Sequence, residues 1–225
     1  MKTTKKIKSM AALDRTKIYS LDAAIDALRP FASKKFDETL DIAIRLGGVD
    51  PTKQDQNIRG MLSLPNGTGK KVKIAVFTKD KQAEAKKAGA DIVGDADLID
   101  KVAGGFMDFD RVLATPEMMP SMAKIAKILG PKGLMPNPKL GTVAANIADA
   151  VQKAKAGQIE YRVEKAGIIH AGIGKMSFTT EKLVENANAL IDVLKKAKPA
   201  SVKGQYILGI SVSTTQGAGL KVENK

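Results

Sequence analysis

The chain has 225 residues, 44% of them hydrophobic, which is enough for one large domain or two ordinary ones and excludes global disorder. It contains no cysteine and one histidine, which excludes disulfides, thiolate zinc sites and cysteine nucleophiles and disfavours the usual catalytic triads. Lysine and arginine number 37 against 24 aspartates and glutamates, and the resulting net charge of +13 favours a polyanionic partner, chiefly nucleic acid.

The first zone of the chain ends near residue 66. Its basic start, MKTTKKIKSMAALDR, lacks the apolar centre of a signal peptide. Ser20 is a predicted N-cap of a short helix that stops before Pro30. In FDETLDIAIRLG the even positions from Leu40 to Leu46 are apolar and the odd ones polar or small, which predicts a half-buried strand. Residues 57–64 are predicted to form a second strand.

The middle zone follows the turn-rich joint PNGTGKK and alternates short apolar strands with amphipathic helices. This alternation predicts a parallel sheet covered on both faces, a small Rossmann-like three-layer α/β unit. The expected strands cover residues 71–77, 91–94, 110–116 and 142–143. The expected helices cover residues 79–90, 96–105, 118–129 and 146–156.

In the third zone, YRVEKAGIIHAGIGKMSF predicts strands broken by glycines, and an amphipathic helix begins at Thr180. QYILGISVSTTQG predicts a strand that runs into a polar turn. Neither outer zone has enough elements for its own core. We therefore expect a discontinuous α+β sheet domain from residues 1–66 plus 160–225, with residues 67–159 inserted as the α/β domain.

Catalysis is poorly supported by the sequence. No stretch fits GxxxxGK[ST] or a strand–GxGxxG–helix pattern, so we expect no bound nucleotide, no other cofactor and no metal. The lone His170 lies in a glycine-flanked apolar strand, where a structural role or a phosphate contact is favoured over a general base. No window approaches eighteen apolar residues, so no membrane span is expected.

Two polar patches allow two interpretations each. SKKFDET (Ser33–Thr39) either caps the core with Phe36 and leaves its lysines in solvent, or offers a basic strand entrance to RNA. SVSTTQGAG (Ser211–Gly219) is either an ordinary turn, or a set of hydroxyls, amides and open backbone that reads RNA sugars and phosphates.

Several motifs in the same order resemble the large-subunit ribosomal proteins of the L-one family, from the mobile stalk beside the exit site. The resemblance covers almost the whole chain. The motifs are MAKIAKILGPKGLMPNPKLGTV, QDQNIRG (Gln54–Gly60), LPNGTGKKVKIAVF (Leu64–Phe77), AGIIHAGIGKMSF (Ala166–Phe178) and STTQGAG (Ser213–Gly219).

This resemblance implies a cytoplasmic, ribosome-bound protein that is no enzyme and is a monomer when free. The implied partners are the stalk region of large-subunit ribosomal RNA, exit-site tRNA, whose release the protein would assist, and its own operon mRNA, which it would repress. The implied RNA contacts are Lys35, Phe36, Thr39, Thr215, Gln216 and Gly217, with Thr214 in the same turn and Lys175 and Ser177 as additional contacts. Where the family turn usually reads Thr-Met-Gly, this chain has Gln216, which exchanges an apolar contact for hydrogen bonds.

The most specific motif, LGPKGLMPNPKLG (Leu129–Gly141), belongs to the expected α/β domain and not to the implied RNA surface. Gly130 and Pro131 can end a helix, while Pro136 and Pro138 predict an extended path. Lys132 and Lys139 are candidates for a secondary RNA contact, although loop lysines are usually just solvated.

Two rival functions remain at this point. A nucleotide-using α/β enzyme would need a glycine loop after a strand, which is missing. A nonspecific basic protein would bind duplex DNA and structured RNA equally well.

Overall fold

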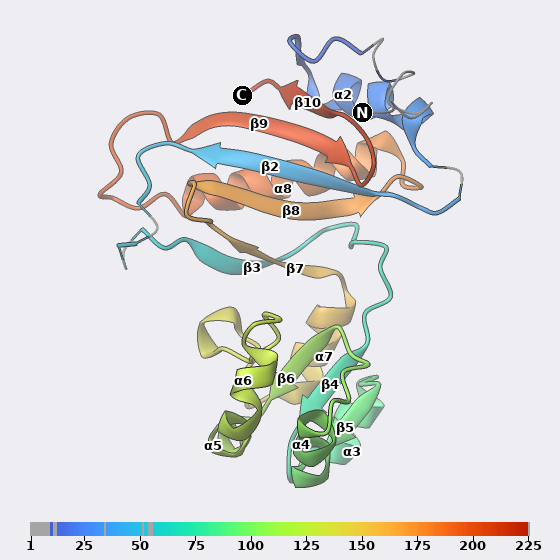
Figure 1. Ribbon diagram of the computed structural model, residues 1–225, viewed down its shortest axis with the longest axis vertical. Helices are drawn as coiled ribbons and strands as arrows, with labels where there is room; N and C mark the ends of the chain where they lie inside the picture. The colour runs from blue at the N-terminus through green and yellow to red at the C-terminus, as the bar shows by residue number, and fades with distance from the viewer. Residues whose placement is uncertain (1–9, 11–12, 34, 51, 54–55, 225) are drawn as a thin grey trace. The chain divides into compact units, whose positions relative to one another are not determined.

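The computed structural model describes residues 10, 13–33, 35–50, 52–53 and 56–224. The chain divides into two compact units, residues 1–70 with 159–225 and residues 71–158 (Figure 1). The combination of helices with several sheets confirms the mixed α and β class expected from the sequence. Whether these units are the separate domains expected for residues 1–66 plus 160–225 and for residues 67–159 stays a prediction.

In the first unit, one five-stranded sheet joins segments from both ends of the chain. Its spatial order is β1 (Ile18–Tyr19), β10 (Gly219–Val222), β9 (Ile207–Thr214), β2 (Thr39–Leu46) and β8 (Ile168–Lys175). Strand β2 runs antiparallel to both β9 and β8. A separate two-stranded sheet pairs β3 (Arg59–Ser63) with β7 (Gln158–Arg162).

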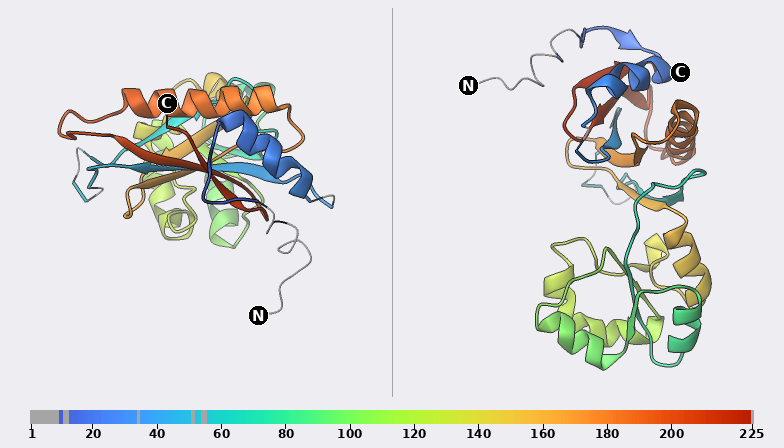
Figure 2. Two further views of the ribbon diagram at one scale, coloured as in Figure 1. Left: turned by 90° about the horizontal axis from the view of Figure 1, so that it is seen from above. Right: turned by 90° about the vertical axis from the view of Figure 1, so that its right-hand side faces the viewer.

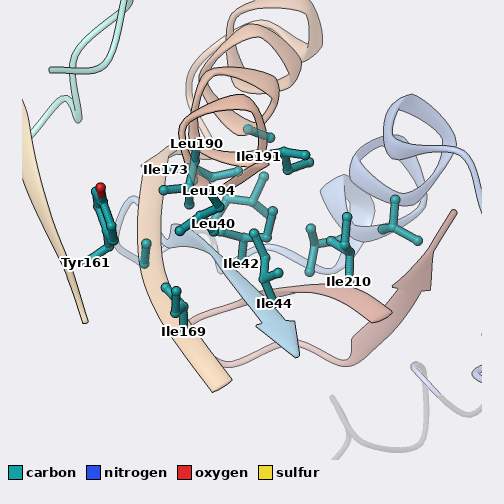
Figure 3. Close-up of a cluster of buried hydrophobic side chains, with 14 of the residues drawn as sticks. Leu40, Ile42, Ile44, Tyr161, Ile169, Ile173, Leu190, Ile191, Leu194 and Ile210 are labelled. Carbon is teal, nitrogen blue, oxygen red and sulfur yellow. The ribbon is translucent and has the colours of Figure 1, made fainter. Parts of the chain in front are cut away.

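The alternation predicted for β2 is confirmed. Leu40, Ile42 and Ile44 are buried and belong to one apolar cluster with Leu190 and Leu194 of helix α8 (Thr180–Lys196), as Figure 3 shows. Each such side chain contributes about 1.5–3 kcal/mol when it is removed from water. One face of the strand is therefore fixed against the core, and the odd-numbered side chains point to the other face.

Helices α8 and α2 (Leu21–Leu28) cover the same face of this sheet (Figure 2). The predicted cap of α2 is confirmed, because the Ser20 hydroxyl accepts a hydrogen bond from Ala23 N at 3.4 Å. The helix ends at Leu28, and Pro30 lies in a 3₁₀ turn, Arg29–Phe31. On the opposite face of the sheet, β2 carries the side chains of Thr39, Asp41, Ala43 and Arg45.

Asn186, a buried polar residue of α8, ties the joint after β3 to the sheet. Its amide Nδ2 donates to Ile173 O at 2.8 Å and to Gly67 O at 2.9 Å, and its Oδ1 accepts from Asn66 N at 3.0 Å. The side chain is 0% exposed. Three backbone groups are thus hydrogen-bonded to one side-chain amide, which keeps residues 66–67 beside the end of β8.

The second unit contains a three-stranded parallel sheet in the order β5 (Ile92–Gly94), β4 (Ile74–Phe77), β6 (Arg111–Ala114). Ile74 and Val76 pack in a cluster with residues of α3 (Gln82–Lys87) and α7 (Ile147–Lys155). Ala75 and Phe77 pack on the opposite side with α4 (Ala96–Ala103), α5 (Met119–Met122) and α6 (Ala126–Leu129). Both faces of the sheet are covered, and β4 is buried along its whole length.

Three expectations for this unit were wrong in detail. The helix expected over 118–129 alternates between short α segments and 3₁₀ turns, Pro116–Met118 and Ala123–Ile125. The expected strand at 142–143 is only an isolated bridge between Ala114 and Val143. Pro138–Leu140 forms a 3₁₀ turn instead of an extended path, because Thr142 Oγ1 accepts from Asn137 N at 2.7 Å and donates to Asn137 O at 3.1 Å, which closes the loop.

The loop after α6 is anchored through two of its apolar side chains. Leu134 and Met135 pack against the cluster on the α4 side. Gly133 adopts a left-handed φ of +69°, and Leu134 N donates to Leu129 O at 3.0 Å, which completes the end of the helix. The segment is a packed helix terminus.

Within the part of the chain that the structure describes, none of the helices has the length and apolar character needed to cross a membrane.

Replacing Asn186 tests the role of the buried amide. Asn186→Ala should lower the free energy of unfolding by about 1–3 kcal/mol, because buried backbone groups lose their partner. Urea denaturation measures the change. Asn188→Ala, at an exposed position of the same helix, is the control and should shift stability by less than about 0.5 kcal/mol. Equal destabilisation by both variants would contradict the interpretation.

Candidate nucleic-acid interface

Three segments that are distant in the sequence meet at the start of β2. We call them the entry segment (residues 35–39), the β8 end (residues 175–177) and the β9–β10 turn (residues 214–217). Thr39 is paired with Lys175 on one side, and Leu40 is paired with Thr214 on the other. The two polar patches identified in the sequence therefore form one surface, here called the strand-and-turn surface.

The entry segment and the turn are joined directly through two threonines. Thr39 N donates to Thr215 Oγ1 at 3.0 Å, and Thr215 N donates to Thr39 O at 3.1 Å. Thr215 Oγ1 also lies 3.4 Å from Thr39 O, as a donor. The turn itself is closed by Gly217 N, which donates to Thr214 O at 2.9 Å. This network holds the turn beside the strand before any ligand arrives.

The β8 end is held from the other side. Lys175 Nζ donates to Asp37 O at 3.1 Å and to Thr39 Oγ1 at 3.0 Å. The Asp37 carboxylate accepts from Ser177 N at 3.1 Å and from Ser177 Oγ at 2.6 Å. Asp37 was missed in the sequence, yet it fixes Ser177, one of the expected contacts. These contacts fix the position of the Lys175 ammonium group at this surface.

Exposure separates the expected contacts into two groups. Phe36 is 43% exposed, which is high for a phenylalanine, and Lys35, Ser177, Thr215 and Gln216 are also exposed. The interpretation that Phe36 caps the core is wrong. Thr39, Lys175 and Gly217 are half-buried.

Thr214 is different from its neighbours, because its side chain is only 4% exposed. Its Oγ1 finds no hydrogen-bond partner among the described residues. Its position in β9 follows the inward-facing series of Ile210 and Val212, both of which are buried. Thr214 therefore shapes the turn from beneath it.

A second missed carboxylate lies under the same surface. Glu38 is 1% exposed, although it stands between the exposed Asp37 and the half-buried Thr39. It occupies an inward position of the alternation that continues through Leu40 and Ile42. A charged residue at an inward-facing position is the signal in the sequence that could have found it.

The face of the sheet away from the helices carries His170 and Asp41. His170 is exposed and its Nε2 lies 3.8 Å from Glu164 Oε2, so the side chain does not belong to the core, and both the structural role and the phosphate contact stay predictions. Burial raises the pKa of the Asp41 carboxyl, while nearby Lys175 and His170 act in the opposite direction.

The candidates for a secondary contact belong to the other unit. Lys132 is exposed, whereas the side chain of Lys139 lies outside the described part of the structure. Lys34 of the first patch, together with Gln54 and Asp55 of the QDQNIRG motif, also falls outside the described residues.

The chemical groups of the strand-and-turn surface are suited to binding and not to catalysis. It combines exposed hydroxyl, amide and backbone groups with an aromatic ring and lysine charges, which suits the sugars and phosphates of a folded RNA. Among the described residues, no group of three or more His, Asp or Glu side chains is placed to hold a metal ion.

Comparison with known protein families identifies the family of this chain. The model of the family described as ribosomal protein L1p/L10e matches residues 28–218. That range includes all three segments of the strand-and-turn surface.

The close approach within the turn can be tested by substitution at Gly217. A Cβ atom there would lie 2.1 Å from Thr214 Oγ1 and 3.2 Å from Thr214 Cβ, so the buried Thr214 side chain would have to leave its present rotamer. Gly217→Ala should therefore destabilise the protein by about 1–3 kcal/mol in thermal or chemical unfolding.

Thr214→Ala provides the matched control. By itself it should be nearly neutral, and in combination it should restore most of the stability lost in Gly217→Ala. Additive effects of the two changes in a double-mutant cycle would rule out the contact.

The raised pKa of Asp41 predicts how the free energy of unfolding depends on pH. Because the folded-state pKa of this carboxyl is raised, its ionised form costs stability above that pKa, and the cost disappears as the pH falls through it. Asp41→Asn should therefore be more stable than the wild type at pH 7, and the difference should shrink toward acidic pH. Unfolding free energies measured across that range check this, and a difference that is independent of pH would contradict it.

Proposed function

Because the chain belongs to the ribosomal protein L1p/L10e family, and is thus an RNA-binding structural protein of the large ribosomal subunit and not an enzyme, we propose that it binds the stalk region of large-subunit ribosomal RNA near the exit site. The strand-and-turn surface is the proposed contact. Its proposed RNA-binding residues are Lys35, Phe36, Thr39, Lys175, Ser177, Thr215, Gln216 and Gly217, together with Thr214, whose buried side chain limits its contribution to the backbone of the turn.

The observation that carries the proposal is the pairing of Thr39 with Thr215. Two segments 176 positions apart in the chain exchange hydrogen bonds and present one fixed set of polar groups. A fixed set of this kind can match the spacing of sugar edges and 2′-hydroxyls, which is how proteins recognise folded RNA by shape.

Charge supplies the remaining attraction. The net charge of +13 attracts a polyanion over long range, and Lys35 and Lys175 place positive charge within the surface itself. Phe36 adds an exposed ring that can stack on a base or a sugar. Phosphate contacts provide affinity, whereas the Thr39–Thr215 pair provides the match to shape.

Gln216 can be exchanged without disturbing the turn. Its side chain is exposed, while its backbone N–H is the group that bonds to the protein, donating to Glu38 Oε2 at 3.4 Å. The amide side chain is therefore available for hydrogen bonds to RNA in place of the apolar contact that methionine makes.

The wider role rests on the family resemblance. We infer that the protein assists release of deacylated tRNA at the exit site and represses translation of its own operon mRNA, acting in the cytoplasm as a monomer until it joins the ribosome. Residues 1–66 plus 160–225 are the proposed RNA-binding domain, and residues 67–159 are the proposed inserted domain. Lys132 and Lys139 of the latter are proposed as a secondary contact for RNA or tRNA.

The proposed contact is tested by Thr215→Val, which keeps the branched shape and removes the hydroxyl. Affinity for a stalk fragment of ribosomal RNA should fall by roughly 5- to 150-fold, the equivalent of about 1–3 kcal/mol. The free energy of unfolding should fall by only about 0.5–1.5 kcal/mol, because Thr39 N loses the Thr215 hydroxyl as its acceptor. Filter binding or calorimetry at fixed salt measures the affinity.

Thr52→Val is the matched control, because Thr52 is also exposed and its hydroxyl donates to the nearby Asp50 Oδ1 at 2.6 Å. It should leave RNA affinity unchanged. Wild-type affinity in Thr215→Val would show that the contact has been assigned to the wrong surface.

The selectivity of the protein for structured RNA is a separate prediction. In competition at physiological salt, the ribosomal RNA stalk fragment should displace duplex DNA at far lower concentration, because a fixed surface distinguishes shapes that share the same phosphate charge. Equal competition by both would instead support a nonspecific basic protein.

A further inference from the structure

Glu38 is a buried carboxylate directly beneath a surface proposed to bind a polyanion. Its Oε1 accepts from Ser33 N at 2.8 Å, and its Oε2 accepts from Gln216 N at 3.4 Å. Its side chain is 1% exposed. One carboxylate therefore bridges the chain ahead of the entry segment to the β9–β10 turn, a link between residues 178 positions apart for Gln216.

The charge of this group opposes RNA binding when it is considered alone. A carboxylate close to RNA phosphates repels them, and taking a carboxylate out of water is costly unless donors satisfy it. Nothing in the attraction between a basic protein and RNA requires an acid at this position. The geometry instead indicates a structural role, because a group with two acceptor oxygens can accept hydrogen bonds from two separate backbone N–H groups at once.

We propose that Glu38 is a positioning residue of the strand-and-turn surface: its carboxylate holds the segment that carries Lys35 and Phe36 and the turn that carries Thr215 and Gln216 in one relative arrangement. This inference rests on the proposed RNA-binding function. The Thr39–Thr215 bonds join the same two segments on the side that faces the solvent, and the buried carboxylate of Glu38 joins them on the side that faces the core. Two links at different depths restrict rotation of the turn, which a single link would allow.

Two substitutions of Glu38 test separately whether the length and the charge of its side chain are needed. Glu38→Gln keeps the length but has only one acceptor oxygen, and its NH₂ group faces a backbone N–H, so one of the two links is lost. Glu38→Asp keeps the charge but is one methylene shorter and cannot span both donors. We predict that each change weakens binding of the ribosomal RNA stalk fragment by about tenfold, as expected for losing a charge-assisted hydrogen bond that holds the surface in place.

Glu160→Gln is the matched control for charge, because Glu160 is an exposed glutamate of the same unit, on β7. It should leave affinity unchanged or raise it slightly. Tighter RNA binding by a folded Glu38→Gln protein, in parallel with Glu160→Gln, would overturn the proposal, since it would mean that Glu38 acts only through its charge.

Amide hydrogen exchange provides a readout that does not depend on RNA. In the wild-type protein the amides of Ser33 and Gln216 should exchange slowly, and in Glu38→Gln at least one of them should exchange faster while amides of β8 and α8 keep their protection. Rapid exchange at both amides in the wild type would overturn the proposal even if neither variant folds. If the wild-type protein does not bind the stalk fragment, the proposed RNA-binding function is wrong. The hydrogen-exchange data then decide independently whether Glu38 holds the turn.

Discussion

The structure of the first unit depends on one constraint, the pairing of β2 on both of its edges with strands from the far end of the chain. Its neighbours β8 and β9 begin more than a hundred residues later, and both run antiparallel to it. Backbone hydrogen bonds on both edges, together with burial of Leu40, Ile42 and Ile44, leave the strand a single register. The entry segment is therefore delivered between the β8 end and the β9–β10 turn.

That arrangement explains why the surface is prepared for a ligand before one binds. Thr39 exchanges hydrogen bonds with Thr215, Lys175 reaches over to Asp37, and Asp37 holds Ser177. Side chains and backbone that are already ordered lose little conformational freedom on binding, so more of the contact energy is retained as affinity. The exposed groups then present a defined shape, which matters for an RNA-binding protein of the large ribosomal subunit because phosphate charge by itself is not selective.

Parts of this description could be read from the sequence and others could not. The alternation from Leu40 to Leu46 and the Ser20 cap depend on neighbouring residues, and both were predicted correctly. The two polar patches were also recognised, and the family resemblance indicated that they act together. The hydrogen bond from Thr39 to Thr215 has no local signature, because partners 176 positions apart depend on the order of strands in the sheet. Strands β1 and β10 were missed because segments of two and four residues are too short to show a period.

Several buried polar residues interrupt apolar patterns that are visible in the sequence. Glu38 and Thr214 both occupy inward positions of strand alternations that were already visible, and in each case a polar residue interrupts an apolar series. In this protein both residues lie where the core face meets the strand-and-turn surface, and Glu38 bonds there to Ser33 N and Gln216 N. Asn186 represents the same kind of position on a helix, with its amide satisfying the joint at residues 66–67.

The central claim is that the entry segment, the β8 end and the β9–β10 turn act together as one RNA-binding surface. Amide hydrogen exchange of the intact protein, recorded with and without a stalk fragment of ribosomal RNA, tests it most directly. We predict that exchange slows on RNA binding in all three segments, residues 35–39, 175–177 and 214–217, at the same RNA concentration. Slowing confined to residues 71–158, or to one of the three segments alone, would contradict it.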